Sequence, residues 1–289
     1  MAVPATNVYL VSTGWICVLD ELGRLGSVGV SSVTPETSPN QSFAQMIEVG
    51  DVVFGGRYRE PDFEIIAQAG CPLAIENTQI NRYPEIKQKL QDLGTVVFTE
   101  YSSTEDDVLG RLEWIKVVGA LFGCEDEVAA LFDQITARVE DVAGEEPTGK
   151  SMVFFYIDED GSAVARRAGD CFAQMIQIAG SKPVSFDAKG EDGATATHIT
   201  VEMEEFFATA KDADVIIYNS TVDEGTTTIA DLVARNELLG QFAAVGAGEV
   251  YTCNANLYQQ MTSTDTIIED IRALLTGAAG SSDFFWKMG

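Results

Sequence analysis

The chain has 289 residues, a formal net charge of −27 and a hydrophobic fraction of 46%. This length suits two domains, and the hydrophobic content indicates packed cores beneath a solvated acidic surface rather than a disordered chain. Because nucleic-acid affinity comes largely from cationic side chains, 45 acidic residues against 18 basic ones exclude a nucleic-acid partner.

Apolar runs alternate with helix-like segments through the first hundred or so residues. The opening, MAVPATNVYLVS, has neither a basic nor an apolar signal region, so either the chain is cytoplasmic or a targeting segment has been removed. No apolar stretch approaches the roughly 20 residues of a membrane span. Strands are predicted over 7–12, 25–32, 51–56, 71–78 and 95–103, and helices over 15–24, 41–49, 61–70 and 83–94. The alternation is typical of βα units and a mostly parallel sheet.

The helix over 61–70 is predicted to begin with Pro61 at its first position and to end at Gly70. After it, two helices without an intervening strand are predicted over 105–122 and 125–143, separated at Gly123. The polar segment 144–150 is a turn that precedes a second region of alternating strands and helices.

This second region opens with a predicted hairpin over 151–169 around the turn 158–161. Further helices or strands are expected over 171–180, 201–213, 214–223, 230–242, 249–257 and 264–277, followed by a flexible spacer and an aromatic tail that docks on the surface. The predicted domains are therefore an N-terminal lobe (1–124), a linker helix (125–146), a C-terminal lobe (147–276) and a tail (277–289).

Cysteine and histidine offer little metal chemistry in this chain. The cysteines are scattered, odd in number and without CxxC spacing, which favours small buried hydrophobes: Cys17, Cys71, Cys124, Cys171 and Cys253. The single histidine, His198, lies in the predicted loop ATATHIT, where a capping or surface role is favoured over contact with a haem iron or a ligand oxygen.

The loops at the carboxyl ends of strands are where open α/β sheets bind ligands. Arg57, Arg59, Arg82 and Arg111 all fall at or just beyond predicted strand ends. Guanidinium groups bind carboxylates or phosphates in pairs of hydrogen bonds, so an anionic ligand would explain this grouping. For any one arginine, an ion pair with a neighbouring acid such as Glu60, Glu76 or Glu113 is the plainer interpretation.

The same loops hold aromatic residues and a glycine pair. Trp15, Tyr58, Tyr101, Trp114 and Tyr258 could stack on a flat ligand, although most aromatics in such positions belong to a core or its rim. Gly55-Gly56 matches no phosphate-binding motif and is predicted to be a tight strand-to-helix turn. The acid pairs Glu204-Glu205 and Asp158 with Asp160 are interpreted as solvated faces.

Four segments, 51–78, 109–142, 201–223 and 238–252, together resemble the solute-binding proteins of ABC importers for iron complexes and cobalamin. The resemblance implies two Rossmann-like α/β lobes joined by one long linker helix, with the ligand cleft between the lobes. It implies a ferric siderophore, haem or corrinoid as ligand, no catalysis and no cofactor of the protein's own. It also implies one glutamate on each lobe, Glu60 and Glu237 by position, that docks to the permease. Relatives that bind zinc or manganese use several histidines, so that branch is not expected.

The sequence thus predicts a monomeric extracytoplasmic protein, periplasmic or lipid-anchored, that hands a metal chelate to an ABC permease and its ATPase. The predicted ligand contacts are Trp15, Arg57, Tyr58, Asn77, Arg82, Arg111, Trp114, Arg166, Arg167, Asn219 and Tyr258. One alternative is a cytoplasmic α/β enzyme that uses a nucleotide or a metal cluster. Another is an interaction module whose acidic surface is the binding face.

Overall fold

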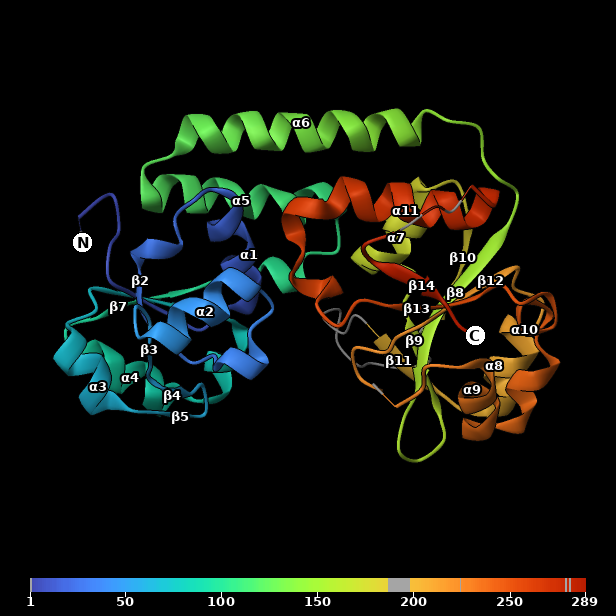
Figure 1. The fold of residues 1–289 in the computed structure, drawn as a ribbon, viewed down its shortest axis with the longest axis horizontal. Helices are drawn as coiled ribbons and strands as arrows, with labels where there is room; N and C mark the ends of the chain where they lie inside the picture. Colours follow the sequence, from blue (N-terminus) through green and yellow to red (C-terminus); the bar gives the residue numbers. More distant parts are fainter. Residues whose placement is uncertain (1, 187–197, 224, 279, 281) are drawn as a thin grey trace. The chain divides into compact units, whose positions relative to one another are not determined.

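The computed structural model describes residues 2–186, 198–223, 225–278, 280 and 282–289 (Figure 1). The chain divides into two compact units, which are described separately. Unit 1 comprises Met1–Ser103, Leu112–Gln134 and Tyr258–Thr262, and unit 2 comprises Thr104–Arg111, Ile135–Leu257 and Ser263–Gly289. Two short segments therefore group differently from the predicted lobes: 104–111 with unit 2, and 258–262 with unit 1.

Unit 1 is built on a parallel sheet with the strand order β3-β2-β1-β6-β7, as the alternating pattern predicts. Helices α3 and α4 cover one face, where Ile66 and Leu90 pack with Tyr9 and Ala74 of the strands. On the opposite face, Trp15 of α1 contacts Phe98 of β7. The elements are β1 (Val8–Leu10), α1 (Thr13–Glu21), β2 (Val28–Ser31), α2 (Gln41–Val49), β3 (Val53–Phe54), α3 (Phe63–Ala69), β6 (Leu73–Glu76), α4 (Pro84–Asp92) and β7 (Val96–Thr99), with short 3-10 turns η1 (Leu25–Ser27), η2 (Pro35–Thr37), η3 (Thr78–Arg82) and η4 (Ser102–Thr104).

The segment between β3 and α3 corrects two predictions. Residues 56–61 do not form a simple strand-to-helix turn, because β4 (Gly56–Arg57) and β5 (Glu60–Pro61) pair as a small antiparallel hairpin. Pro61 lies in this hairpin rather than at the first position of the helix. The helix begins after Asp62, whose carboxylate accepts hydrogen bonds from the backbone N–H groups of Glu64 and Ile65, which is the usual role of an N-cap acid.

Helices α5 (Val108–Phe122) and α6 (Glu125–Ala143) match the two predicted helices that no strand separates. Each of them crosses the division between the units, α5 after Arg111 and α6 after Gln134. In unit 1, Arg24 forms an ion pair with Glu127 of α6, and Lys116 of α5 lies 3.7 Å from the ring centroid of Phe132. These contacts fix the first half of α6 within unit 1.

Unit 2 holds a mixed sheet with the order β11-β9-β8-β12-β13-β14, in which β10 also pairs with β8. Strands β8, β10, β12 and β13 are parallel, while β9, β11 and β14 run antiparallel to their partners. One face packs on α8, α9 and α10, and α7 covers the other through Phe172 against Phe154. The elements are β8 (Ser151–Ile157), β9 (Ala163–Arg166), α7 (Cys171–Ile178), β10 (Lys182–Val184), β11 (His198–Val201), α8 (Met203–Ala210), β12 (Val215–Tyr218), α9 (Ile229–Arg235), η5 (Glu237–Gln241), α10 (Ala243–Ala247), β13 (Val250–Cys253), η6 (Leu257–Gln259), η7 (Met261–Ser263), α11 (Thr264–Thr276) and β14 (Phe285–Lys287).

Two further predictions in unit 2 are settled by strand pairing. The hairpin over 151–169 is confirmed as β8 and β9. His198 does not lie in a loop, because it begins β11 and pairs opposite Arg166; residues 194–197 of the predicted loop lie outside the described residues. The aromatic tail docks as predicted, and it does so as a strand: β14 pairs with β13 and buries Phe284 and Phe285. The spacer before it includes residues 279 and 281, which are also outside the described part.

All five cysteines are buried and none forms a disulfide, which confirms their prediction as small core residues. Within the described residues, no helix combines the length and the apolar character needed to cross a bilayer.

The hairpin that carries Arg57 depends on a glycine. Gly56 has φ +81°, and a Cβ atom there would lie 2.5 Å from the carbonyl oxygen of Glu60 and 2.7 Å from the amide nitrogen of Asp62. Gly50, which ends α2, has a similar φ of +87° but nothing within 4 Å of that position. Both sites carry the left-handed backbone penalty of a side chain, and only Gly56 adds a clash with backbone atoms.

We therefore expect Gly56→Ala to destabilise the protein by at least about 2 kcal/mol, against about 1 kcal/mol for the control Gly50→Ala. Urea unfolding of both variants measures the difference. Equal losses of unfolding free energy at the two positions would show that the hairpin backbone shifts to accommodate the Cβ atom without an energetic penalty.

Candidate functional site

Glu100 ties together two loops at the carboxyl end of the unit 1 sheet. It follows β7, and its side chain is buried. Ser12, which follows β1, donates a hydrogen bond of 2.8 Å from Oγ to Glu100 Oε1. The backbone N–H and the hydroxyl of Ser102 donate to Oε2 at 2.7 and 2.6 Å. The carboxylate thus has three donors in place of the water that it loses.

A second acid at the same edge, Glu76, is treated differently. It ends β6 and is 3% exposed, yet no described residue donates a hydrogen bond to its carboxyl group. Burial raises the pKa of Glu76 to about 8. The next residue, Asn77, caps the turn η3 by accepting a hydrogen bond from the backbone N–H of Gln79 at 2.9 Å.

Four of the predicted ligand contacts lie on two neighbouring loops of unit 1. Arg57 and Tyr58 belong to the 56–61 hairpin, while Asn77 caps η3 and Arg82 is its last residue. Tyr58 meets Tyr83, directly after η3, in an edge-to-face contact with ring centroids 6.4 Å apart. Arg57 and Arg82 are both exposed. The structure therefore brings two arginines that the sequence separates by 25 positions onto adjoining loops.

Arg59 points towards Tyr58 rather than away from the hairpin. Its Nε donates a 2.7 Å hydrogen bond to the Tyr58 hydroxyl, and its guanidinium carbon lies 5.1 Å from the centre of that ring. These two contacts with the exposed Arg59 restrain the orientation of the Tyr58 ring.

The other aromatic candidates are placed in different surroundings. Trp15 is fully buried against Phe98, with ring centroids 5.7 Å apart, so its position favours support of the loop after β1 over direct stacking on a ligand. Trp114 is half-buried on α5, and its ring centroid lies 6.5 Å from that of Tyr101. Tyr258 is half-buried in the segment that groups with unit 1. Their ligand roles stay predictions.

In unit 2, two arginines gather around one buried acid. Asp170 is the N-cap of α7 and is 4% exposed, and its Oδ2 accepts a hydrogen bond from Phe172 N at 3.0 Å. Arg166 Nη1 lies 3.4 Å from Asp170 Oδ1, with its guanidinium over the rings of Phe154 and Phe172. Arg111, which groups with unit 2 rather than with the predicted first lobe, opposes the effect of burial on the pKa of the Cys171 thiol.

The charges in this cluster act on one another. Burial raises the pKa of Asp170, against the opposing effects of Arg166, the backbone N–H donors and Arg111. Burial and Arg166 lower the pKa of His198, which pairs opposite Arg166 on β11. Arg167, the next residue after β9, is half-buried and bridges to the backbone of Phe186. The cluster therefore places two guanidinium groups near one buried carboxyl group.

Asn219 is buried within a group of hydrogen-bonded polar residues at the ends of β12 and β13. It is 4% exposed, and its Oδ1 accepts a 2.6 Å hydrogen bond from the Thr221 hydroxyl. The Ser220 hydroxyl donates to the carbonyl oxygen of Cys253 at 2.7 Å. These hydrogen bonds fix the conformation of the loop after β12. Asn219 therefore supports this loop as a buried residue.

One part of the same loop was missed by sequence reasoning. Asp223 is 8% exposed and receives hydrogen bonds at its Oδ2 from the hydroxyls of Tyr218 (2.6 Å) and Thr226 (2.7 Å) and from Arg235 Nε (2.8 Å). Burial raises the pKa of Asp223, but these donors outweigh it and lower the pKa overall. The signal would have been an acid between a strand end and a helix that carries an arginine in its last turn.

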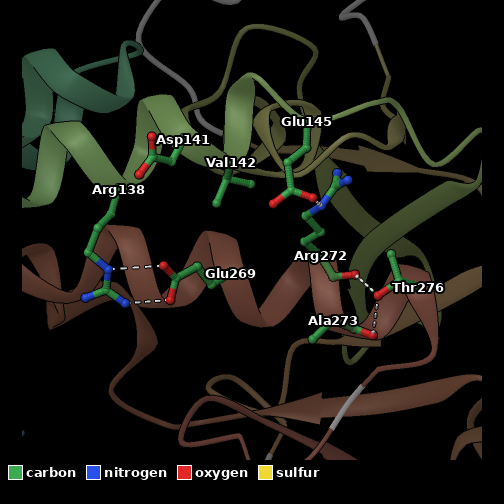
Figure 2. A pocket seen from close by; sticks show the side chains of 8 residues that line it. All are labelled: Arg138, Asp141, Val142, Glu145, Glu269, Arg272, Ala273 and Thr276. Carbon is green, nitrogen blue, oxygen red and sulfur yellow. Dashed lines mark hydrogen bonds and ion pairs between the residues drawn. The ribbon is translucent and has the colours of Figure 1, made fainter.

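A groove of about 410 Å³ lies between α6 and α11 of unit 2, and Figure 2 shows its lining. Arg138 forms two hydrogen bonds with Glu269 and an ion pair of 2.7 Å with Asp265. Arg272 pairs with Glu145 at 2.6 Å. Both arginines form ion pairs with nearby acids, so these side chains link the two helices and do not form an anion-binding site. The predicted docking residues lie elsewhere: Glu60 and Glu237 are both exposed, on β5 and η5.

Comparisons with known proteins agree with this architecture. The family model described as "Periplasmic binding protein" matches residues 8–257. A haem-binding protein of Vibrio cholerae, HutB, superposes with a TM-score of 0.73 at 12% identity, covering 95% of this chain and 100% of that one. The petrobactin-binding protein YclQ of Bacillus subtilis gives 0.69 at 18% identity, with coverage of 94% and 92%.

Among curated proteins, an uncharacterized lipoprotein of Methanocaldococcus jannaschii is 24% identical over 94% of this chain. The chain spans 66% of the length of that relative and 58% of a second lipoprotein from the same organism. The structural likeness supports the expected two-lobe α/β fold, and the family match covers most of the sequence. The chain belongs to the periplasmic binding protein family.

Proposed function

We propose that this chain is an extracytoplasmic solute-binding protein, held at the cell surface by a lipid anchor, that delivers an anionic metal chelate to an ABC permease and its ATPase. The family supports a binding role over the enzyme alternative. Similar folds are described as haem- and petrobactin-binding proteins, and two relatives are named lipoproteins. A chelated metal brings its own ligands, so the protein needs charge and shape complementarity rather than metal-binding side chains.

The observation that carries the proposal is the placement of positive charge. In a chain of net charge −27, Arg111 and Arg166 both lie near the buried carboxyl group of Asp170 in unit 2, and Arg57 and Arg82 lie on two adjoining exposed loops in unit 1. Guanidinium groups retain their charge at any physiological pH and form paired hydrogen bonds with carboxylates. Such groups would attract an anionic ligand that the rest of the surface repels.

A thermal-shift screen tests the proposal. The panel contains ferric siderophores with free carboxylates, haem, corrinoids and each chelator without metal. We expect at least one metal-loaded anionic member to raise the melting temperature, because a ligand that binds only the folded state stabilises it. Unchanged melting with every member of the panel would contradict the proposal.

The arginines of unit 1 can be tested with a charge-matched control. Arg57→Ala together with Arg82→Ala is expected to weaken binding of the best panel member by at least about tenfold, since each lost charge-assisted hydrogen bond is worth roughly 1.5 kcal/mol or more. The control, Arg24→Ala with Lys116→Ala, removes the same charge from unit 1 at the ion pairs with Glu127 and Glu113. Calorimetry should show the control near the wild-type affinity, and equal losses in both variants would remove Arg57 and Arg82 from the site.

A further inference from the structure

Glu76 and Glu100 are two buried acids at the ends of adjacent strands, and only one of them has donors. Glu100 accepts hydrogen bonds from Ser12 and Ser102, as described above. Glu76 is equally buried, at 3% exposure, and receives none from any described residue. An ionised carboxylate without donors or a counter-charge is costly in a protein interior, so this position favours the neutral acid.

The described polar side chains on the same face of the sheet supply Glu76 with no hydrogen-bond donor. Tyr9 of β1 is in register with Ala74, two residues before Glu76, and Thr99 of β7 is in register with Glu76 itself. Since alternate residues of a strand share a face, these three side chains lie on the face that α3 and α4 cover. The hydroxyl oxygens of Tyr9 and Thr99 are buried, and no partner for either is found in the described chain.

A protonated carboxyl group can both donate and accept a hydrogen bond, whereas a carboxylate can only accept. Neither hydroxyl forms a hydrogen bond with the Glu76 carboxyl group, so neither stabilises its ionised form. The pKa of Tyr9 is raised by burial first, then by Glu76 and by Cys71.

Burial raises the pKa of Glu76 to about 8, and within the described residues no ion pair with its carboxyl group is found. The arginines of the hairpin and of η3, Arg57, Arg59 and Arg82, are exposed. The titratable and charged groups on the elements packed around it are Tyr9, Arg57, Tyr58, Arg59, Glu60, Asp62, Glu64, Cys71, Arg82, Tyr83, Glu85, Lys87, Lys89, Asp92 and Glu100.

We propose that Glu76 is a proton-binding switch that keeps the carboxyl end of β6 ordered while it is protonated. Ionisation of Glu76 draws water into the buried face and loosens the turn that begins at Asn77, the residue that caps η3 and precedes Arg82. The switch thus couples the pH of the surroundings to the order of a loop at this edge of unit 1.

The sign of the pH dependence follows from proton binding. Between the ordinary value of 4.5 and about 8, folded Glu76 holds a proton that the unfolded chain has lost. Stability therefore falls as pH rises through this window, and it levels off above it. Glu76→Gln replaces the acid by a neutral group of the same shape and removes the dependence.

The test is urea unfolding of wild type and Glu76→Gln from about pH 5 to about pH 8. We expect the ratio of their unfolding constants, wild type over variant, to grow by about tenfold per pH unit across most of the window. Two controls accompany it. Glu64→Gln, exposed on α3, should follow wild type at every pH. Glu100→Gln should be destabilised at every pH because its amide group faces the donors of Ser102.

Hydrogen exchange measured near pH 8 and near pH 6 adds a local readout. Amides of 78–82 should exchange faster in wild type than in Glu76→Gln near pH 8, and equally near pH 6. If Glu76→Gln does not fold, the side-chain carbon resonance of Glu76 in the wild-type protein gives its titration directly. Parallel pH curves for wild type and Glu76→Gln, or a resonance that titrates near pH 4 to 5, would overturn the proposal.

Discussion

The burial of carboxyl groups at the ends of strands is the constraint around which both sheets are organised. A buried carboxylate must recover the hydrogen bonds and counter-charge that water would have given it. Glu100 does so with serine donors from two loops, Asp170 with a helix N-terminus and Arg166, and Asp223 with two hydroxyls and Arg235. Glu76 has none of these partners, and burial raises its pKa to about 8. Glu100 joins segments 88 positions apart through Ser12, whereas Asp170 and Asp223 use partners at most 12 positions away. These acids therefore fix the loops at the strand ends mainly by local contacts, with Glu100 as the long-range one.

The order of strands and helices could be predicted from the sequence because apolar periodicity is a local property. Helix α6 occupies the range expected from its apolar face, and the hairpin β8–β9 surrounds the expected turn. The failures share a physical reason. Strands β4 and β5 have two residues each and therefore no period, and the hairpin they form displaced Pro61 from the helix. The pairing of β14 with β13, and of His198 with Arg166, depends on partners that local patterns do not reveal.

The candidate site was predictable by residue type but not by grouping. Loops at strand ends did contain the arginines, and Tyr58 and Tyr83 show that two of these loops adjoin. Arg111 and Tyr258 each group with the unit opposite to the one expected, because α5 and the segment 258–262 cross the division that a linear reading draws. Asp170 and Asp223 were not singled out, and Glu76 was named only as an acid that could pair with an arginine, since the sequence of an acidic chain does not show which of its 45 acids are buried.

An acidic protein that binds an anionic ligand must place positive charge at the binding site itself, because the rest of its surface repels the ligand. This is the central claim of the account. Guanidinium groups can supply the attraction only by direct contact with charged atoms of the ligand. The most direct test is calorimetry with one carboxylate-bearing ferric chelate from the binding panel and its analogue in which the carboxylates not bound to iron are neutralised. The account predicts that neutralisation weakens binding by at least about tenfold, the loss of one charge-assisted contact. Equal affinity for the two chelates would contradict it.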